Sequence, residues 1–141
     1  MTSPTPEPFR HPLVVPFHDV DSMRIVWHGN YVKYLEQARC AYFEHRGMTY
    51  TDMEAAGFLL PVVSLNVKYI HPCVFGQHLT IEVTRDLDND NLLVLHYLIR
   101  DAATNRCHLK ATTRHAAISA ATGELLFELP STFLRRLGNA P

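Results

Sequence analysis

The sequence predicts an α+β fold in which an antiparallel sheet of about five to six strands wraps around one long helix. An apolar stripe with helical spacing runs from Tyr31 to Tyr42, and Gly47 follows it as a helix end. The second half of the chain instead alternates apolar and polar residues, as half-buried strands do. A chain of 141 residues is long enough to bury one core. The apolar faces of helix and sheet can bury each other, which is the physical reason for the predicted architecture.

The N-terminal region divides into an arm and a first strand. Residues 1–12 are rich in proline and lack a long apolar run, so we expect a flexible arm and no signal peptide. Residues 13–17 form a short apolar run that contains Pro16, which favours an edge strand because proline cannot donate to a ladder. A single domain is therefore predicted over residues 13–141.

The boundaries of the later elements follow from caps and turn residues. Asn30 can cap the long helix through its side-chain oxygen, and Gly57 ends a short helix predicted over residues 50–56. Turn residues separate the strand patterns, among them the Asp/Asn run at residues 88–91. The predicted strands cover residues 62–69, 79–84, 93–99 and 107–118, and a last short helix covers residues 131–137.

Composition excludes several classes of function. The net charge of −1 and the absence of a Lys/Arg cluster argue against a nucleic-acid partner and against binding to an anionic membrane. No apolar run is long enough to span a membrane. The three cysteines, Cys40, Cys73 and Cys107, are odd in number and widely spaced. That pattern favours a reducing compartment, here the cytoplasm, over a disulfide framework, and it excludes a zinc site built from cysteines.

An acidic pair and a histidine precede the long helix. Asp21 lies between the first predicted strand and this helix, whose N-terminus offers unpaired N–H groups and a partial positive charge. Such a terminus stabilises an oxyanion, and a nearby carboxylate can attack a carbonyl or activate a water molecule. Asp21 and His28 are therefore candidate catalytic residues for the hydrolysis of an ester or thioester.

Structural interpretations of the same residues stay open. Asp and Asn in front of a helix commonly cap it or form a turn, and His28 can be a half-buried histidine at the start of a helix. A metal site built from His18, Asp19 and Asp21 would lack a reinforcing histidine pair. We therefore predict neither a metal ion nor another cofactor.

Candidate substrate-binding residues are Trp27, Tyr31 and Ser64, the last within residues 62–65 of a predicted strand. Their aromatic and aliphatic surroundings suit an aliphatic or aryl acyl group. The alternative for the two aromatic residues is a place in the core. Ser64 is not predicted to be a nucleophile, because no G-x-S-x-G motif surrounds it.

Four short motifs resemble the signature of the 4-hydroxybenzoyl-CoA thioesterase family, which has the hot-dog fold. They are DVD at residues 19–21, IVWH at 25–28, NY at 30–31 and EQAR at 36–39. The resemblance implies an acyl-CoA thioesterase that releases a free acid and CoA and needs no cofactor beyond the CoA of its substrate. It also implies that Asp21 acts as nucleophile or general base and that the helix start near His28 forms the oxyanion hole. A homodimer or homotetramer would hold the thioester between subunits.

One residue departs from this signature, because Arg24 stands where the family usually has glycine. Arginine there can strain the loop, or it can point outward and contact the substrate. Two other functions stay open: a non-catalytic protein that binds or scaffolds acyl thioesters, and a thioesterase that acts on acyl-carrier protein. A hot-dog dehydratase is disfavoured, because its histidine-centred motif is missing.

Overall fold

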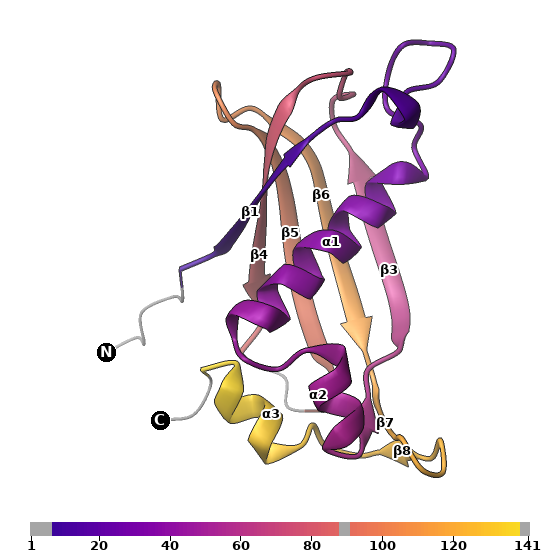
Figure 1. Cartoon of the computed structure of the whole chain (residues 1–141), viewed down its shortest axis with the longest axis vertical. Helices are drawn as coiled ribbons and strands as arrows, with labels where there is room; N and C mark the ends of the chain where they lie inside the picture. Colours follow the sequence, from indigo (N-terminus) through magenta and orange to yellow (C-terminus); the bar gives the residue numbers. More distant parts are fainter. Residues whose placement is uncertain (1–6, 88–90, 139–141) are drawn as a thin grey trace.

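The computed structural model describes residues 7–87 and 91–138. Most of the expected N-terminal arm, residues 1–6, and most of the Asp/Asn turn, residues 88–90, lie outside the described residues. In the described part, the long helix α1 (Asn30–His45) crosses one face of the main sheet (Figure 1). The predicted pairing of one helix with one sheet is therefore present.

The main sheet has five antiparallel strands, with the first and third strands at its two edges. In spatial order they are β1 (Phe9–Val14), β4 (His78–Arg85), β5 (Leu93–Asp101), β6 (Cys107–His115) and β3 (Val62–Tyr69). A smaller sheet contains β2 (Phe58–Leu59), β7 (Ala117–Ser119) and β8 (Leu125–Leu126). The remaining elements are the 3₁₀ turn η1 (Phe17–Asp19) and the short helices α2 (Tyr50–Ala55) and α3 (Ser131–Arg136).

The core lies between α1 and the main sheet. Tyr34, Leu35 and Phe43 form part of the buried face of α1. Ile81 and Leu95, from neighbouring strands of the sheet, belong to the same buried cluster. Each such aliphatic side chain contributes about 1.5–3 kcal/mol when it leaves water, so this layer fixes the position of the helix and of the residues that precede it.

The start of α1 differs from the prediction in its cap. The helix begins at Asn30 as expected, but Gly29 occupies the N-cap position and no side chain caps the helix there. The side-chain amide of Asn30 instead donates to the backbone oxygen of Asp19 at 2.9 Å. Asn30 therefore ties the preceding loop to the helix instead of satisfying the helix terminus.

The first strand begins earlier than predicted. It covers Phe9–Val14, so residues 9–12 belong to the sheet and not to a flexible arm. The strand does lie at an edge, but Pro12 is the proline within it, whereas Pro16 precedes the η1 turn. Pairing with β4 over six residues compensates for the single missing donor of Pro12.

The opposite edge of the sheet, β3, is largely uncovered. Val62, Val63, Leu65 and Tyr69 are all exposed apolar or aromatic residues of this strand. The predicted alternation of buried and exposed residues fails here, because α1 does not cover the edge. An uncovered apolar edge strand is a common place for another chain to associate.

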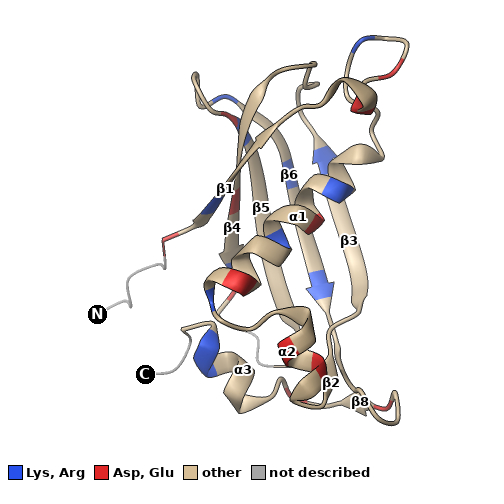
Figure 2. Cartoon of the chain, viewed as in Figure 1, with Lys and Arg blue, Asp and Glu red and all other residues tan. Residues whose placement is uncertain are grey.

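Charges are spread over the described residues without a basic stripe, as Figure 2 shows. Among these residues no helix has the length and apolar character needed to cross a membrane.

Candidate functional site

The residues that lead into α1, residues 19–31, form what we call the helix-start segment. Its tip is a tight turn in which the Asp21 N–H donates to the Ile25 oxygen and the Arg24 N–H donates to the Asp21 oxygen, both at 2.9 Å. The Asp21 carboxylate accepts the Met23 N–H at 2.8 Å. Arg24 has φ +65°, a left-handed conformation that favours glycine. The arginine therefore adopts a backbone conformation that glycine, the usual residue of the family signature, reaches at no steric cost.

Asp19 anchors this segment from within. Its side chain is buried and accepts the Tyr34 hydroxyl at 2.7 Å and the Lys33 ammonium at 3.3 Å. Its backbone oxygen also accepts the Trp27 N–H at 3.0 Å. Burial raises the pKa of the Asp19 carboxyl, but the bonds from Tyr34 and Lys33 outweigh burial and hold this pKa below its usual value. Asp19 is thus a structural anion, whereas Asp21 is only partly buried.

The last residues before α1 present free backbone donors. The N–H groups of His28 and Gly29 donate to no acceptor within the described residues. The carbonyl oxygen of His28 accepts the Tyr69 hydroxyl at 2.9 Å, which fixes this peptide against β3. The Trp27 ring lies over Gly29, where an added Cβ would be 2.2 Å from the ring. Because a helix N-terminus carries a partial positive charge, these two N–H groups can hold an anionic oxygen.

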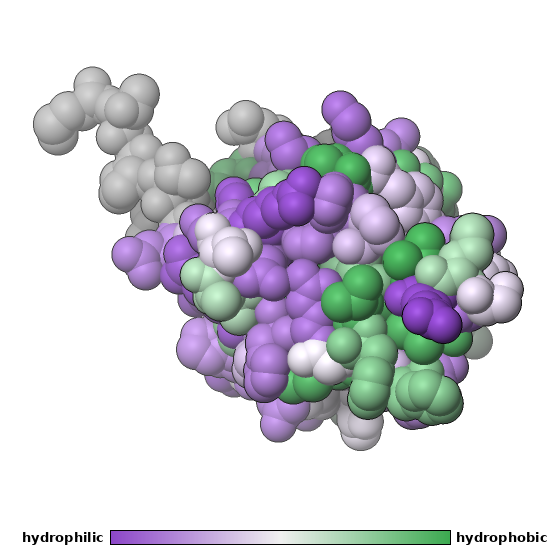
Figure 3. Space-filling model, turned by 90° about the horizontal axis from the view of Figure 1, so that it is seen from above, coloured by the Kyte–Doolittle hydropathy of each residue, from purple (hydrophilic) through white to green (hydrophobic). Residues whose placement is uncertain are grey.

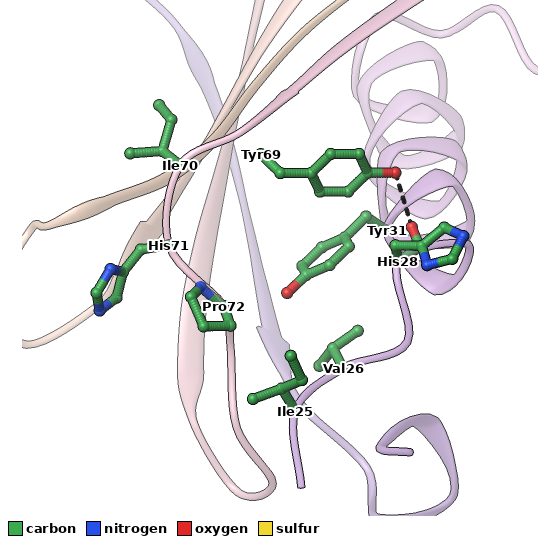
Figure 4. A pocket seen from close by; sticks show the side chains of 8 residues that line it. All are labelled: Ile25, Val26, His28, Tyr31, Tyr69, Ile70, His71 and Pro72. Carbon is green, nitrogen blue, oxygen red and sulfur yellow. Dashed lines mark hydrogen bonds between the residues drawn. The ribbon is translucent and has the colours of Figure 1, made fainter. Parts of the chain in front are cut away.

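A cavity of about 290 Å³ lies beside these donors, between the helix-start segment and the end of β3 (Figure 4). The Tyr31 and Tyr69 rings lie in it with centroids 5.6 Å apart. The Tyr31 hydroxyl accepts the Cys73 N–H at 3.0 Å, and burial raises the pKa of Tyr31, so the hydroxyl keeps a proton that it can donate. The cavity is lined by Ile25, Val26, His28, Tyr31, Tyr69, Ile70, His71 and Pro72.

The predicted site residues divide into two groups. His28 and Tyr31 line the cavity, while Asp21, Trp27 and Ser64 do not line it. Asp21 is one backbone hydrogen bond from Ile25, which does line the cavity. Trp27 is half exposed, with its ring centroid 5.0 Å from that of His28. Ser64 lies further along β3 and pairs with Arg114.

Six of the eight lining residues were not among the predicted site residues, and two of these six, Tyr69 and His71, have polar side chains. They lie at the end of a strand that comes about forty positions after the helix-start segment, so local spacing gave no indication that the two segments meet. The only signal in the sequence was the breaker Pro72, which marks the point where β3 ends.

Apolar side chains gather on one side of the end of the molecule shown in Figure 3, and hydrophilic side chains cover the other side. Exposed apolar residues of the loops include Phe17, Met23 and Phe75. The Phe17 and Phe75 rings contact each other edge to face with centroids 5.5 Å apart. The loop before the helix-start segment is thus packed against the turn between β3 and β4.

Known proteins resemble this chain in sequence and in structure. A family model described as the thioesterase-like superfamily matches residues 15–137. YneP of Bacillus subtilis, a candidate acyl-CoA thioesterase, is 33% identical over 104 residues, which cover 74% of this chain and 75% of YneP.

A 1,4-dihydroxy-2-naphthoyl-CoA thioesterase from Synechocystis superposes with a TM-score of 0.84 at 18% identity, covering 95% of this chain and 99% of that one. A hypothetical protein from Thermus thermophilus has a TM-score of 0.80 at 26% identity, covering 92% and 96%. The hot-dog fold is thereby confirmed.

Proposed function

The chain belongs to the thioesterase-like superfamily and is a thioester hydrolase, and on that premise we propose that it hydrolyses an aliphatic or aryl acyl-CoA to a free acid and CoA. The CoA thioesters in the names of its relatives support this class of substrate. The mainly apolar cavity, with two aromatic rings, suits an acyl group. No cofactor takes part beyond the CoA of the substrate.

The pair of free backbone donors at the start of α1 carries the proposal. A thioester whose acyl group enters the cavity would place its carbonyl oxygen on the N–H groups of His28 and Gly29. Charge that develops on this oxygen during attack is stabilised there by donors that need no reorganisation. The hydrogen bond from Tyr69 to the His28 carbonyl holds the peptide in place.

Asp21 supplies the attacking chemistry in one of two ways. As a nucleophile, its carboxylate adds to the carbonyl carbon, the C–S bond breaks, and the thiolate departs. The product of this step is a mixed anhydride between Asp21 and the acyl group, which water then hydrolyses. As a general base, it takes a proton from a water molecule whose oxygen adds to the same carbon, and the thiolate leaves directly. Both routes end in a free acid and CoA.

We also propose that the active form is a homodimer or homotetramer in which a second copy completes the site. The uncovered apolar edge of β3 lies next to the cavity and supports this assembly. A second chain there would enclose the Asp21 turn and the cavity in one compartment. The three cysteines, all free, fit a cytoplasmic location.

The decisive test is Asp21→Asn, assayed with short, medium, long and aromatic acyl-CoAs. We expect the variant to lose at least about a hundredfold in kcat, the usual cost of a lost catalytic group. Single-turnover hydrolysis in water labelled with oxygen-18 then separates the two routes, because only a nucleophilic Asp21 acquires the label.

Asp52→Asn is the matched control. Asp52 also accepts a backbone N–H in a local turn, but it caps α2, far along the chain from the cavity. It should lose little activity, so a large loss in Asp21→Asn cannot come from weakening a turn alone. Turnover at the wild-type rate by a folded Asp21→Asn variant would overturn the role of Asp21.

A further inference from the structure

A second pocket, of about 380 Å³, adjoins the first on the other side of residues 70–72. The two pockets share His71 and Pro72 in their linings. Figure 4 shows the His71 ring on the side of this segment that faces away from Tyr31 and Tyr69. The second pocket, which we call the polar pocket, is lined by six residues with polar side chains, together with Pro72 and Val74; the six are His71, Gln77, Asp101, Thr104, Arg106 and His108.

The wall between the two pockets is fixed by the buried His108. Its Nε2 lies 3.2 Å from the Gln77 amide nitrogen, which can only donate, so the His108 proton resides on Nδ1. That N–H faces the carbonyl oxygens of His71 at 3.0 Å and Pro72 at 3.2 Å. The Gln77 amide is held in turn by Asp101 at 2.8 Å. The segment that separates the pockets is therefore a preorganised wall.

The open side of the pocket presents hydrogen-bond donors. The Arg106 guanidinium lies 3.1 Å from His71 Nδ1, and because arginine only donates, His71 must accept there and carry its proton on Nε2. Burial, then the charge of Arg106 and the neighbouring His108, lower the pKa of His71, so its ring is neutral at pH 7. Arg106 forms no ion pair within the described residues. Both side chains therefore have donors left for a ligand.

The one carboxylate of the pocket is already occupied. Asp101 accepts the Gln77 amide through Oδ2 and the N–H groups of Ala103 and Thr104 through Oδ1. These bonds, the one from Gln77 first, lower the pKa of Asp101 to about 2, so its charge is constant at neutral pH. Asp101 thus keeps its negative charge in the pocket, but its oxygens are held by its own turn and by Gln77, and it forms no ion pair with Arg106.

We propose that Arg106 and His71 bind a phosphate group of the phosphopantetheine carrier while the acyl thioester occupies the neighbouring cavity. The proposal rests on the proposed thioesterase function and extends it to recognition of the carrier. A neutral imidazole N–H beside a guanidinium offers the directed donors that a phosphate oxygen prefers. An arm that crosses the edge of this shared segment would reach from the polar pocket into the first cavity. CoA and acyl-carrier protein both supply such a phosphate.

The test compares two thioesters with the same acyl group, acyl-CoA and acyl-pantetheine, which lacks phosphate. Arg106→Gln should raise KM for acyl-CoA about tenfold, the size of one charge-assisted hydrogen bond, and should raise KM for acyl-pantetheine by less than about twofold. Arg114→Gln is the matched control, because Arg114 is an exposed arginine of the same strand region that does not line the pocket. It should change neither constant.

Equal effects of Arg106→Gln on the two thioesters, or no effect on either, would overturn the phosphate site. An acyl-carrier-protein arm identifies the source of the phosphate: a KM effect with both carriers indicates the phosphate next to pantetheine, and an effect with CoA alone indicates its nucleotide phosphates. Calorimetric binding of CoA to both proteins tests the site without catalysis. Tight CoA binding that depends on Arg106, without hydrolysis of any thioester, would support this site and reject the proposed function.

Discussion

Two regions of this molecule hold polar groups in place by different means. Many bonds of the helix-start segment join residues at most 15 positions apart, such as Tyr34 to Asp19, while Tyr69 and Cys73 add bonds from more than 40 positions away. A second region, which we call the buried polar chain, consists of Arg39, Tyr97, Thr113 and His115. It joins α1 to β5 and β6, and the bond from Arg39 to Tyr97 spans 58 positions.

The difference shows how each region resists change. The helix-start segment is partly exposed, so its bonds compete with water and can rearrange locally. In the buried polar chain the Tyr97 and Thr113 hydroxyls are 2.8 Å apart, and His115 bonds Thr113 at 2.9 Å and the Leu60 oxygen at 3.1 Å. A buried polar group that loses its hydrogen-bond partner there cannot form a replacement hydrogen bond with water. We therefore expect the buried polar chain to govern stability and the helix-start segment to govern activity.

The largest expected effect on stability comes from His115. Burial, assisted by the charge of Arg39, lowers the pKa of His115 from 6.5 to about 4 in the folded protein. Between these two values the unfolded chain binds a proton that the folded chain does not, so stability falls as the pH is lowered. The loss amounts to about 3 kcal/mol for one such group. Urea unfolding measured at several pH values from 7 to 4 should show this slope.

His115→Gln should remove that part of the slope, whatever its effect on stability at pH 7. His96→Gln, at an exposed histidine of β5, should keep the wild-type slope. A slope that is unchanged in His115→Gln would show that other groups cause the acid sensitivity.

A smaller effect separates the two aspartates of the helix-start segment. Asp19→Asn should lower the free energy of unfolding at pH 7 by about 1–3 kcal/mol, because it removes the charge that faces Tyr34 and Lys33. Because the folded pKa of Asp19 is depressed, its contribution is present above the unfolded value and disappears as the pH falls through the folded one. The variant and the wild type should therefore converge in acid.

Asp21→Asn is the companion measurement. It should change stability by less than about 1 kcal/mol, because the amide oxygen can still accept the Met23 N–H. If Asp21→Asn proved the more destabilising of the two, the division between anchor and reactive group would be wrong.

The smallest effect concerns the left-handed residue of the turn. Arg24→Gly should raise the free energy of unfolding by about 1 kcal/mol, because glycine reaches φ +65° without the steric cost of a Cβ. Asn105→Gly is the matched control at φ +63°, and its gain should be smaller because asparagine tolerates this region. Urea midpoints measure both. A loss of stability in Arg24→Gly would mean that the arginine side chain makes a compensating contact.

The sequence was a good guide to elements with a strong period. The long helix, β3 and the short helix before Gly57 lie where apolar spacing and turn residues put them. The first strand was misplaced, because a proline-rich segment looks like a linker until a neighbouring strand pairs with it. The prediction that Asn30 caps the helix was wrong, because its side-chain amide donates to the backbone oxygen of Asp19, eleven positions earlier.

Only part of the candidate site could be predicted from the sequence. The acidic motif and His28 lie within ten residues of one another, so their spacing before a helix could suggest a catalytic segment. Tyr69 and His71 come from a distant strand, and His108 and Gln77 hold that strand end in place. Nothing in local spacing predicts these contacts, because they depend on how the sheet curves past the helix.

By itself, the sequence determined the local chemistry of this protein: a helix with one apolar face, alternating strands, and an acidic turn in front of the helix. These features depend on residues within a few positions of one another, so periodicity and turn preferences suffice to find them. Only the tertiary structure decided that Asp19 is the buried anchor, that Tyr69 holds the His28 peptide, and that a polar pocket adjoins the apolar one. Those contacts join segments whose proximity is set by packing in the core, and the order of residues along the chain does not specify that proximity locally.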